Sequence, residues 1–225
     1  MTTEQLRHRM PPILKALKER SLRGRTPVEG LRRTECAYHG WDTVHADAAS
    51  WEPFAPGDAF GGLEAHHCFK GTVTLPEASA GKRVVCLVST GASDIWNNNN
   101  PQFLAYVDGR LVCGLDVNHN EFDLAACAVP GESHELALYV YCNTPARDVF
   151  LRVETAERDD DVTGLYYDLR APYEVCALLA DDDTRAIGIM KHLNRALNLL
   201  DLRDLDSGAF AQSVRDAREY LRTEF

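Results

Sequence analysis

The residues with the clearest potential for ligand chemistry are Trp96 and the four asparagines that follow it, Asn97–Asn100. An exposed indole can stack on the apolar face of a pyranose ring while neighbouring amides hydrogen-bond its hydroxyl groups. Asparagines do not sustain a long strand, so we expect a loop here. A buried tryptophan that anchors an Asn-rich turn explains the same residues. We therefore name Trp96, Asn97 and Asn98 as candidate carbohydrate contacts and keep the structural alternative open.

Two further groups of polar residues are candidate ligand contacts. Asp116 and Asn118 share a face if their segment is extended, so Asp116 and His119 are candidate contacts for a sugar hydroxyl or a metal ion. An Asx turn with a hydrogen-bonded histidine explains them more simply. His66 and His67 are adjacent, and in a strand they point to opposite faces, which excludes a same-face metal pair. We expect one of these two histidines to be buried and the other exposed.

We predict no catalytic residue, no metal ligand and no cofactor site in this chain. The seven cysteines include no pair at CxxC spacing, and most lie in apolar runs as buried thiols, so a structural zinc site has no support. The acidic runs Asp159–Asp161 and Asp181–Asp183 lack the alternating donors and the glycine of a calcium loop. Ser207-Gly208 lacks the preceding residues of a nucleophile elbow. We therefore expect that the chain alone is not an enzyme.

The composition is that of a globular protein. The 225 residues are 45% hydrophobic and 26% charged, which disfavours disordered and fibrous classes. A formal net charge of −10 disfavours nucleic acid as a partner, because phosphate neutralisation needs a basic surface. Residues 1–33 carry +6 and the remainder −16, which predicts a basic N-terminal helix on an acidic body, a nucleic-acid arm being the weaker alternative. No stretch has the apolar length of a secretion signal or a membrane span, so we expect a cytoplasmic protein without a membrane partner.

The first secondary-structure element that we expect along the chain is a helix. Apolar residues recur at helical spacing near the N-terminus, but Pro11 and Pro12 should break or restart the helix, which leaves an amphipathic helix over about residues 12–22. Residues 24–65 are rich in glycine and proline and show no sustained period. We expect an irregular connector there, in which Trp41 and Trp51 serve as hydrophobic pegs.

From His66 the pattern changes to short β-rich runs separated by turn residues, as in an antiparallel sandwich. Asp108-Gly109 lies between two of the runs and is typical of a tight hairpin. No gap between runs holds a crossover helix, which disfavours a parallel sheet. The expected strands are residues 67–75, 83–90, 102–107, 110–114, 133–142, 148–156 and 163–169.

After about residue 170 the period becomes helical again. Apolar residues from Val175 to Leu200 form one stripe, Pro172 suits a first helical turn, and Ser207 is a good N-cap for a last helix. The stripe needs a partner surface. The predicted division is an N-terminal helix and connector (1–65), an antiparallel β-sandwich (66–170) and a helical linker (171–225) that leads to a missing domain.

A series of short motifs runs in order from Trp51 to Asn143. They are Trp51, Pro53 and Phe54; Phe60-Gly61-Gly62; His67-Cys68-Phe69; Val73-Thr74-Leu75-Pro76 with Gly81; Thr90-Gly91 and Trp96; Tyr106-Val107-Asp108-Gly109; Gly114-Leu115-Asp116 with His119; and the Leu-Tyr-Val-Tyr run at 138–141. This ordered set resembles the N-terminal region of family 38 glycoside hydrolase α-mannosidases. Cys68 departs from the pattern, since relatives often have Trp there.

The resemblance implies a mainly β fold with helices, in which a jelly-roll, galactose-binding-like sandwich is preceded by an N-terminal helix and followed by C-terminal helices. It also implies a parent enzyme that hydrolyses terminal α-mannosides with retention through a zinc-dependent catalytic domain. The His-x-Asp-x-Ala-Trp motif of that domain is not found. The segment His45–Trp51 comes near it but has an extra residue and precedes the sandwich.

On this resemblance we expect a noncatalytic region that braces the catalytic domain of the same polypeptide and shapes its glycan cleft. The expected partners are that domain, further copies in a homo-oligomer and a mannose-containing glycan, and the zinc belongs to the missing domain. The stripe Val175–Leu200 would dock on that domain, so the isolated chain would self-associate. The alternative is a stand-alone carbohydrate-binding module that uses Trp96 and Asn97–Asn100. A scaffold or sensor domain with the same architecture is a third class.

Overall fold

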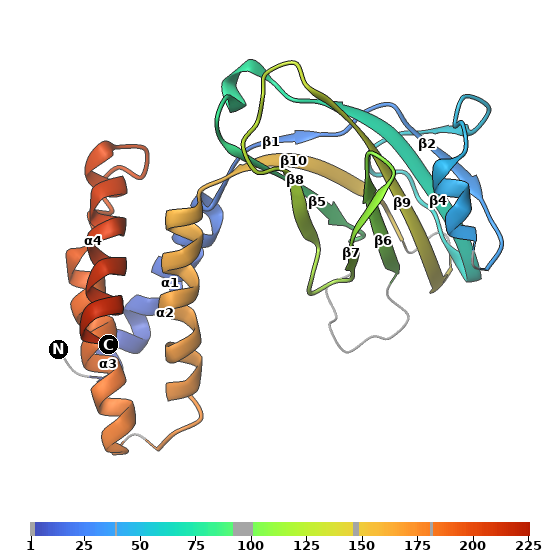
Figure 1. Ribbon diagram of the computed structural model, residues 1–225. Helices are drawn as coiled ribbons and strands as arrows, with labels where there is room; N and C mark the ends of the chain where they lie inside the picture. The colour runs from blue at the N-terminus through green and yellow to red at the C-terminus, as the bar shows by residue number, and fades with distance from the viewer. Residues whose placement is uncertain (1–2, 39, 92–100, 146–148, 181) are drawn as a thin grey trace. The chain divides into compact units, whose positions relative to one another are not determined.

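The computed structural model describes residues 3–38, 40–91, 101–145, 149–180 and 182–225. The chain forms two compact units (Figure 1). The sandwich unit comprises Gly24–Glu157, and the helical unit comprises Met1–Arg23 together with Arg158–Phe225. Each unit has its own hydrophobic core.

The sandwich unit contains two sheets, and the strand pairings described residue by residue are antiparallel. This confirms the predicted β-sandwich with helices. The larger sheet has the order β3-β2-β4-β9-β6-β7, and the smaller has the order β1-β10-β5-β8. The larger sheet consists of β2 (Leu31–Glu35), β3 (Glu52–Phe54), β4 (Gly62–Thr74), β6 (Gln102–Val107), β7 (Arg110–Leu115) and β9 (Ser133–Thr144). The smaller sheet consists of β1 (Leu22–Pro27), β5 (Arg83–Ser89), β8 (Glu121–Ala125) and β10 (Arg152–Arg158), and two short 3-10 helices, η1 (Gly40–His45) and η2 (Glu77–Ser79), complete the unit.

Alternation along the long central strands gives the larger sheet two different faces. On the inner face, Phe69 of β4 lies opposite Leu138 of β9, and both are fully buried in the core between the sheets. On the outer face, Cys68 lies opposite Tyr139, and the two belong to a second, smaller cluster. Because successive side chains in a strand point to opposite faces, two apolar faces require apolar residues at consecutive positions. The Leu-Tyr-Val-Tyr run of β9 meets that requirement.

The predicted Asp108-Gly109 hairpin is confirmed. It joins β6 to β7, and both residues have positive φ, +51° for Asp108 and +74° for Gly109. Asp108 also accepts hydrogen bonds from the amide of Glu135 and from Nδ1 of His134 at 2.9 and 2.8 Å. The bond with His134 is the main reason that the pKa of Asp108 is lowered.

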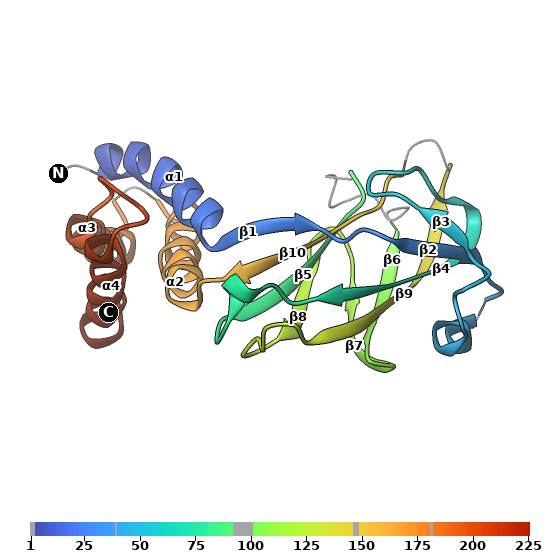
Figure 2. The same ribbon diagram turned by 90° about the horizontal axis from the view of Figure 1, so that it is seen from above.

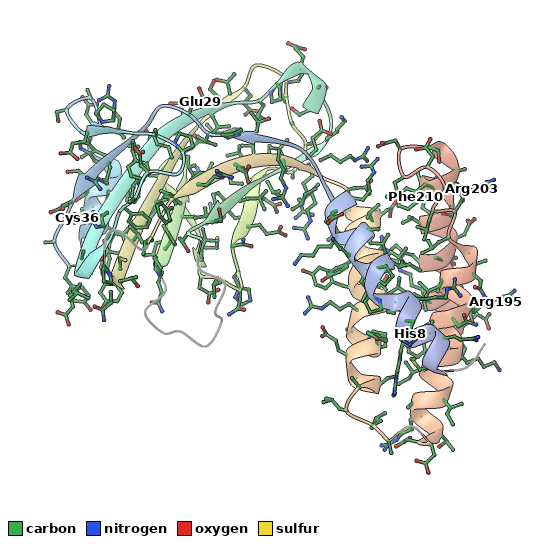
Figure 3. All side chains as sticks on the ribbon, turned by 180° about the vertical axis from the view of Figure 1, so that it is seen from behind. His8, Glu29, Cys36, Arg195, Arg203 and Phe210 are labelled. Atoms are coloured by element: carbon green, nitrogen blue, oxygen red, sulfur yellow. The ribbon has the colours of Figure 1, made fainter. Side chains whose placement is uncertain are left out.

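The helical unit packs four helices around one core (Figure 2). They are α1 (Thr3–Arg20), α2 (Asp160–Cys176), α3 (Thr184–Leu199) and α4 (Gly208–Glu224). α4 begins as predicted, because the hydroxyl of Ser207 accepts a hydrogen bond from the amide of Phe210 at 3.1 Å. Phe210, labelled in Figure 3, is buried in the core of this unit.

The predicted break at Pro11 and Pro12 is wrong, because α1 is continuous from Thr3 to Arg20. A proline inside a helix lacks the amide that would bond the carbonyl four residues earlier. For Pro11 that carbonyl belongs to Arg7, and the hydroxyl of Tyr173 in α2 donates to it at 3.4 Å. Packing against α2 thus supplies a partner for the freed carbonyl.

The strand expected at residues 163–169 is also wrong, since this stretch lies inside α2. The side chain of Asp159 caps the helix by accepting from the amide of Val162 at 3.1 Å. The buried residues that follow have helical spacing, namely Val162, Leu165, Tyr166 and Leu169. Pro172 consequently lies inside the helix and not in its first turn.

Much of the apolar stripe from Val175 to Leu200 is already covered within this chain. Met190, Leu193 and Leu197 of α3 are buried within the helical unit, whereas Val175 and Leu178 are exposed. The prediction that the entire stripe docks elsewhere is therefore wrong. α1 and α4 cover the stripe, and the sequence alone does not identify these helices as its partners.

Residues 24–65 are more regular than the predicted connector. They contain β2 and β3, which extend the larger sheet, and η1, which packs on β4 and β9. Trp51 is buried in the outer cluster as expected of a peg. Within the described residues, no helix combines the length and apolarity needed to cross a membrane.

Candidate functional site

A cleft of about 1000 Å³ lies on the outer face of the larger sheet. Its floor comes from three neighbouring strands: His66 from β4, Tyr139 and Tyr141 from β9, and Gln102 from β6. The register places His66 opposite Tyr141, and Tyr141 opposite Gln102. Strand alternation therefore aligns these side chains on one face, away from the core between the sheets.

The aromatic rings of the floor form one connected group. The ring centroids of His66 lie 5.8 Å from Tyr139 and 5.2 Å from Tyr141, and the first pair is nearly parallel. The hydroxyl of Tyr139 is 2.7 Å from Nδ1 of His66, at hydrogen-bond distance. Cross-strand aromatic pairs stabilise a sheet, and here they also fix the orientation of the floor.

A wall of the cleft comes from the segment that follows β2. Tyr38 stands 5.5 Å from His66, and Trp41 of η1 makes an edge contact with Tyr139 at 6.0 Å. Tyr38 is 69% exposed and Trp41 37% exposed, so both rings offer surface to a ligand. Exposed aromatic rings beside a preformed floor are typical of binding sites.

Polar groups hold the segment that carries Trp41 on the sheet. The buried ammonium group of Lys70 donates to the carbonyl of Ala46 at 2.9 Å and pairs with Glu135 at 3.1 Å. The guanidinium of Arg32 donates to the carbonyl of Trp51 at 2.9 Å. These bonds anchor the chain directly after η1, the element that carries Trp41.

The rim beside β4 has unusual backbone geometry. Gly61, Gly62 and Glu64 all have positive φ, at +119°, +142° and +51°, and the register between β4 and β9 shifts between Gly62 and Ala65. The amide of Glu64 donates to Oδ1 of Asn143 at 3.2 Å. A bulge of this kind redirects a side chain, and strained backbone of this kind is concentrated at functional sites. It places Glu64 in the lining of the cleft.

His67 supports this rim from the inner face. It is buried, its ring makes edge contact with Phe60, and Nε2 lies 3.2 Å from the carbonyl of Gly61. Burial lowers the pKa of His67, because a charged imidazolium would lose its hydration. His67 is therefore neutral, and its ring N–H can donate to Gly61. One histidine of the pair is buried, as expected, but the other, His66, is half-buried in the cleft and not exposed.

Cys36, labelled in Figure 3, also lines the cleft, at the end of β2. Its sulfur is 3.7 Å from that of Cys68, and burial raises the pKa of both thiols. Neutral thiols are poor nucleophiles and poor metal ligands. Across the part of the chain that the structure describes, no group of three or more histidine, cysteine, aspartate or glutamate residues is arranged to hold a metal ion.

The candidate contacts named from the sequence lie elsewhere. Trp96, Asn97 and Asn98, with the rest of the Asn-rich stretch, fall outside the described residues. Asp116 forms a turn in which its carboxylate accepts from the amides of Asn118 and His119, each at 2.8 Å, and these bonds, that from His119 first, lower the pKa of Asp116. The structure thus contains the predicted Asx turn, and neither Asp116 nor His119 lines the cleft.

The main residues of the cleft were not selected from the sequence. Trp41 was expected to be a peg, and Tyr139 and Tyr141 were noted only as part of an ordered motif. A signal was available in β9, where Tyr139 and Tyr141 alternate with apolar residues and must share one face. For Tyr38 and Glu64 no local pattern exists, because their positions depend on η1 and on the bulge.

No protein-family model and no curated protein matches the chain. Solved structures with a similar fold include the β-glucuronidase of Ruminococcus gnavus (TM-score 0.44, 8% identity), which matches 61% of this chain and 29% of that one. The β-glucuronidase of Faecalibacterium prausnitzii has a TM-score of 0.40 and 14% identity over 60% of this chain and 32% of that one. The chain therefore matches less than a third of these proteins, and the likeness concerns the fold alone.

The resemblance to family 38 α-mannosidases is wrong. No family model supports it, and the solved structures named above are β-glucuronidases. The ordered motifs that suggested it are accounted for by local structure. Tyr106-Val107-Asp108-Gly109 makes a hairpin, Gly114-Leu115-Asp116 leads into an Asx turn, and Leu138–Tyr141 is a central strand with two apolar faces. Such features recur in unrelated sandwiches.

Proposed function

We propose that the sandwich unit is a noncatalytic saccharide-binding module that holds its ligand in the cleft lined by Tyr38, Trp41, His66, Tyr139 and Tyr141. The observation that carries the proposal is the combination of exposed aromatic rings with a preformed floor on one face of the sheet. Sugar rings present apolar C–H faces that pack on aromatic rings, and their hydroxyl groups need polar partners. Gln102 and Glu64 supply such partners in the same lining.

The size of the cleft supports an oligosaccharide ligand. Binding sites for small molecules have volumes of roughly 300–1000 Å³, and this cleft is at the upper end of that range. It lies on a rigid sheet, where hydrogen-bonded strands fix the spacing of the rings. Such preorganisation lowers the entropy cost of binding.

The surroundings of the acidic residues favour binding over hydrolysis. A glycosidase needs one carboxyl group in apolar surroundings to act as the general acid, with a second carboxylate at a fixed separation. Glu35 and Glu64 are both exposed to solvent. Each therefore lacks the apolar environment of a general acid, but each can accept a hydrogen bond from a sugar hydroxyl.

The first test is a calorimetric titration of the full chain with cellotetraose, mannotetraose and chitotetraose. We expect at least one tetrasaccharide to bind, and we expect Trp41→Ala to weaken that binding by about tenfold or more, a loss of about 1.4 kcal/mol. The matched control is Tyr167→Ala, which removes an exposed aromatic ring of the helical unit. It should leave the affinity unchanged.

Two results would contradict the proposal. One is that Trp41→Ala and Tyr167→Ala affect the affinity equally, which would remove the cleft as the binding site. The other is release of reducing sugar from any of these tetrasaccharides by the wild-type chain and not by Glu64→Gln. The unit would then be catalytic.

A further inference from the structure

Two free thiols meet beneath the wall of the cleft. The sulfur atoms of Cys36 and Cys68 lie 3.7 Å apart, and neither residue is part of a disulfide. Cys68 lies opposite Thr34 of β2, and the amide of Cys36 donates to the carbonyl of His66 at 3.0 Å. Because residues two positions apart in a strand share a face, both thiols lie on the outer face of the larger sheet.

Buried cysteines elsewhere in the chain have different partners. The sulfur of Cys142 is 3.6 Å from the carbonyl oxygen of Thr144, and that of Cys176 is 3.8 Å from the carbonyl oxygen of Ala186. In those contacts a thiol donates to the backbone, as expected of a cysteine that fills a core. The partner of Cys36 is a second thiol, which can react with it.

The two thiols differ in their access to solvent and in their acidity. Cys68 is completely buried, whereas Cys36 is partly exposed and lines the cleft. Burial raises the pKa of Cys36, and the hydrogen bond from Cys68 partly offsets this effect. Burial also raises the pKa of Cys68, and the charge on ionised Cys36 raises it further. Cys36 is therefore the thiol that ionises first and that a dissolved reagent reaches first.

A glycine leaves room beside the sulfur of Cys36. A Cβ atom at Gly40 would lie only 3.0 Å from Cβ and 3.2 Å from Sγ of Cys36. The S–S distance of a disulfide is about 2.0 Å, so the two sulfurs must still approach each other. Cys36 follows the last residue of β2, and a rotation of its side chain with a small shift of the chain there can close the distance.

We infer that Cys36 and Cys68 form a reversible disulfide, with a small disulfide of the glutathione type as the oxidant. The Cys36 thiolate attacks one sulfur of glutathione disulfide, and the released glutathione thiolate takes up the proton that Cys36 has lost. Cys68 then loses its proton and attacks the Cys36 sulfur of the mixed disulfide, which releases and protonates the second glutathione. Two electrons and two protons thus pass from the protein to two glutathione molecules. The new bond joins the segment before Tyr38 and η1 to the strand that carries His66.

The experiment incubates the full chain with glutathione disulfide, blocks the remaining thiols with iodoacetamide and maps the peptides by mass spectrometry without reduction. We expect a linked pair of peptides that contain Cys36 and Cys68, and we expect dithiothreitol to separate them. The bond should form faster as the pH is raised above neutrality, because burial raises the pKa of Cys36. This test does not depend on the saccharide-binding function.

Three variants test the order of the two steps. In Cys68→Ala the resolving thiol is missing, so glutathione should remain attached to Cys36. In Cys36→Ala the buried Cys68 should take up no glutathione. The matched control Cys127→Ala removes an exposed thiol outside the cleft and should leave formation of the Cys36–Cys68 bond unchanged.

Two results would overturn the inference. One is the absence of linked Cys36 and Cys68 peptides from the oxidised wild type, a result that requires no variant to fold. The other is attachment of glutathione to Cys68 in Cys36→Ala as fast as to Cys36 in Cys68→Ala, because the two thiols would then react independently.

Discussion

At the scale of single residues, the cleft depends on a histidine that does not line it. His67 is buried between the sheets, and its ring nitrogen holds the carbonyl of Gly61 at the rim. His66, the next residue, lies on the opposite face in the aromatic floor. Two consecutive residues of β4 thus have different roles: His67 supports the rim, and His66 contributes to the surface that can contact a ligand. The opposite faces were predictable from alternation, whereas the bond to Gly61 was not, because it depends on the bulge at the start of β4.

His67 predicts a pH dependence of stability. In the unfolded chain a histidine binds a proton with a pKa of about 6.5. In the folded chain burial lowers the pKa of His67. Arg33 and His66 lower it further by smaller amounts, and the bond to Gly61 and the charge of Glu35 oppose the shift without reversing it. The unfolded state therefore binds more protons below about pH 6.5. The free energy of unfolding should fall as the pH decreases from neutrality through this value, and the loss should level off below the folded-state pKa.

The measurement is urea denaturation across this range for the wild type, His67→Gln and His45→Gln. In His67→Gln this part of the pH dependence should disappear. His45 is an exposed histidine of the same unit, and its replacement should leave the slope as in the wild type. An unchanged slope in His67→Gln would show that another group binds the proton.

At the scale of elements, the helix boundaries show what local sequence can and cannot predict. Ser207 was identified as an N-cap because its hydroxyl accepts a bond from an amide three residues later, which is a local interaction. The continuity of α1 through Pro11 was not predicted, because the donor to the carbonyl of Arg7 is Tyr173, in another helix. The same reason applies to the wall of the cleft, where Trp41 is positioned by anchors on β2 and β4.

The cap of α4 gives a prediction for the helical unit. Ser207→Ala removes the acceptor for the amide of Phe210 and should lower the free energy of unfolding of this unit by about 0.5–2 kcal/mol. Ser207→Asp keeps an acceptor at the same position and should retain most of the stability. Chemical denaturation followed by the circular dichroism of the helices measures both. Equal losses in the two variants would mean that the cap hydrogen bond does not stabilise α4.

At the scale of the whole molecule, the chain has two hydrophobic cores that share no residue. The helical core joins α1 with three helices that follow the sandwich in the sequence. Periodicity predicted most of these helices, but it does not indicate that segments separated by the entire sandwich pack together. That is why the apolar stripe of α3 was assigned to an absent partner. Pairing between distant segments is tertiary information that local spacing does not contain.

Separate cores predict separate unfolding transitions. Leu193 is completely buried in the helical core and Leu138 in the sandwich core, so each Leu→Ala change should cost about 2–5 kcal/mol in its own unit. Calorimetry should show two transitions, with Leu193→Ala lowering one and Leu138→Ala lowering the other. Because the cleft belongs to the sandwich unit, the Leu193→Ala variant should bind the tetrasaccharide with wild-type affinity at a temperature below both transitions. A single transition lowered by either change would show that the two units unfold as one.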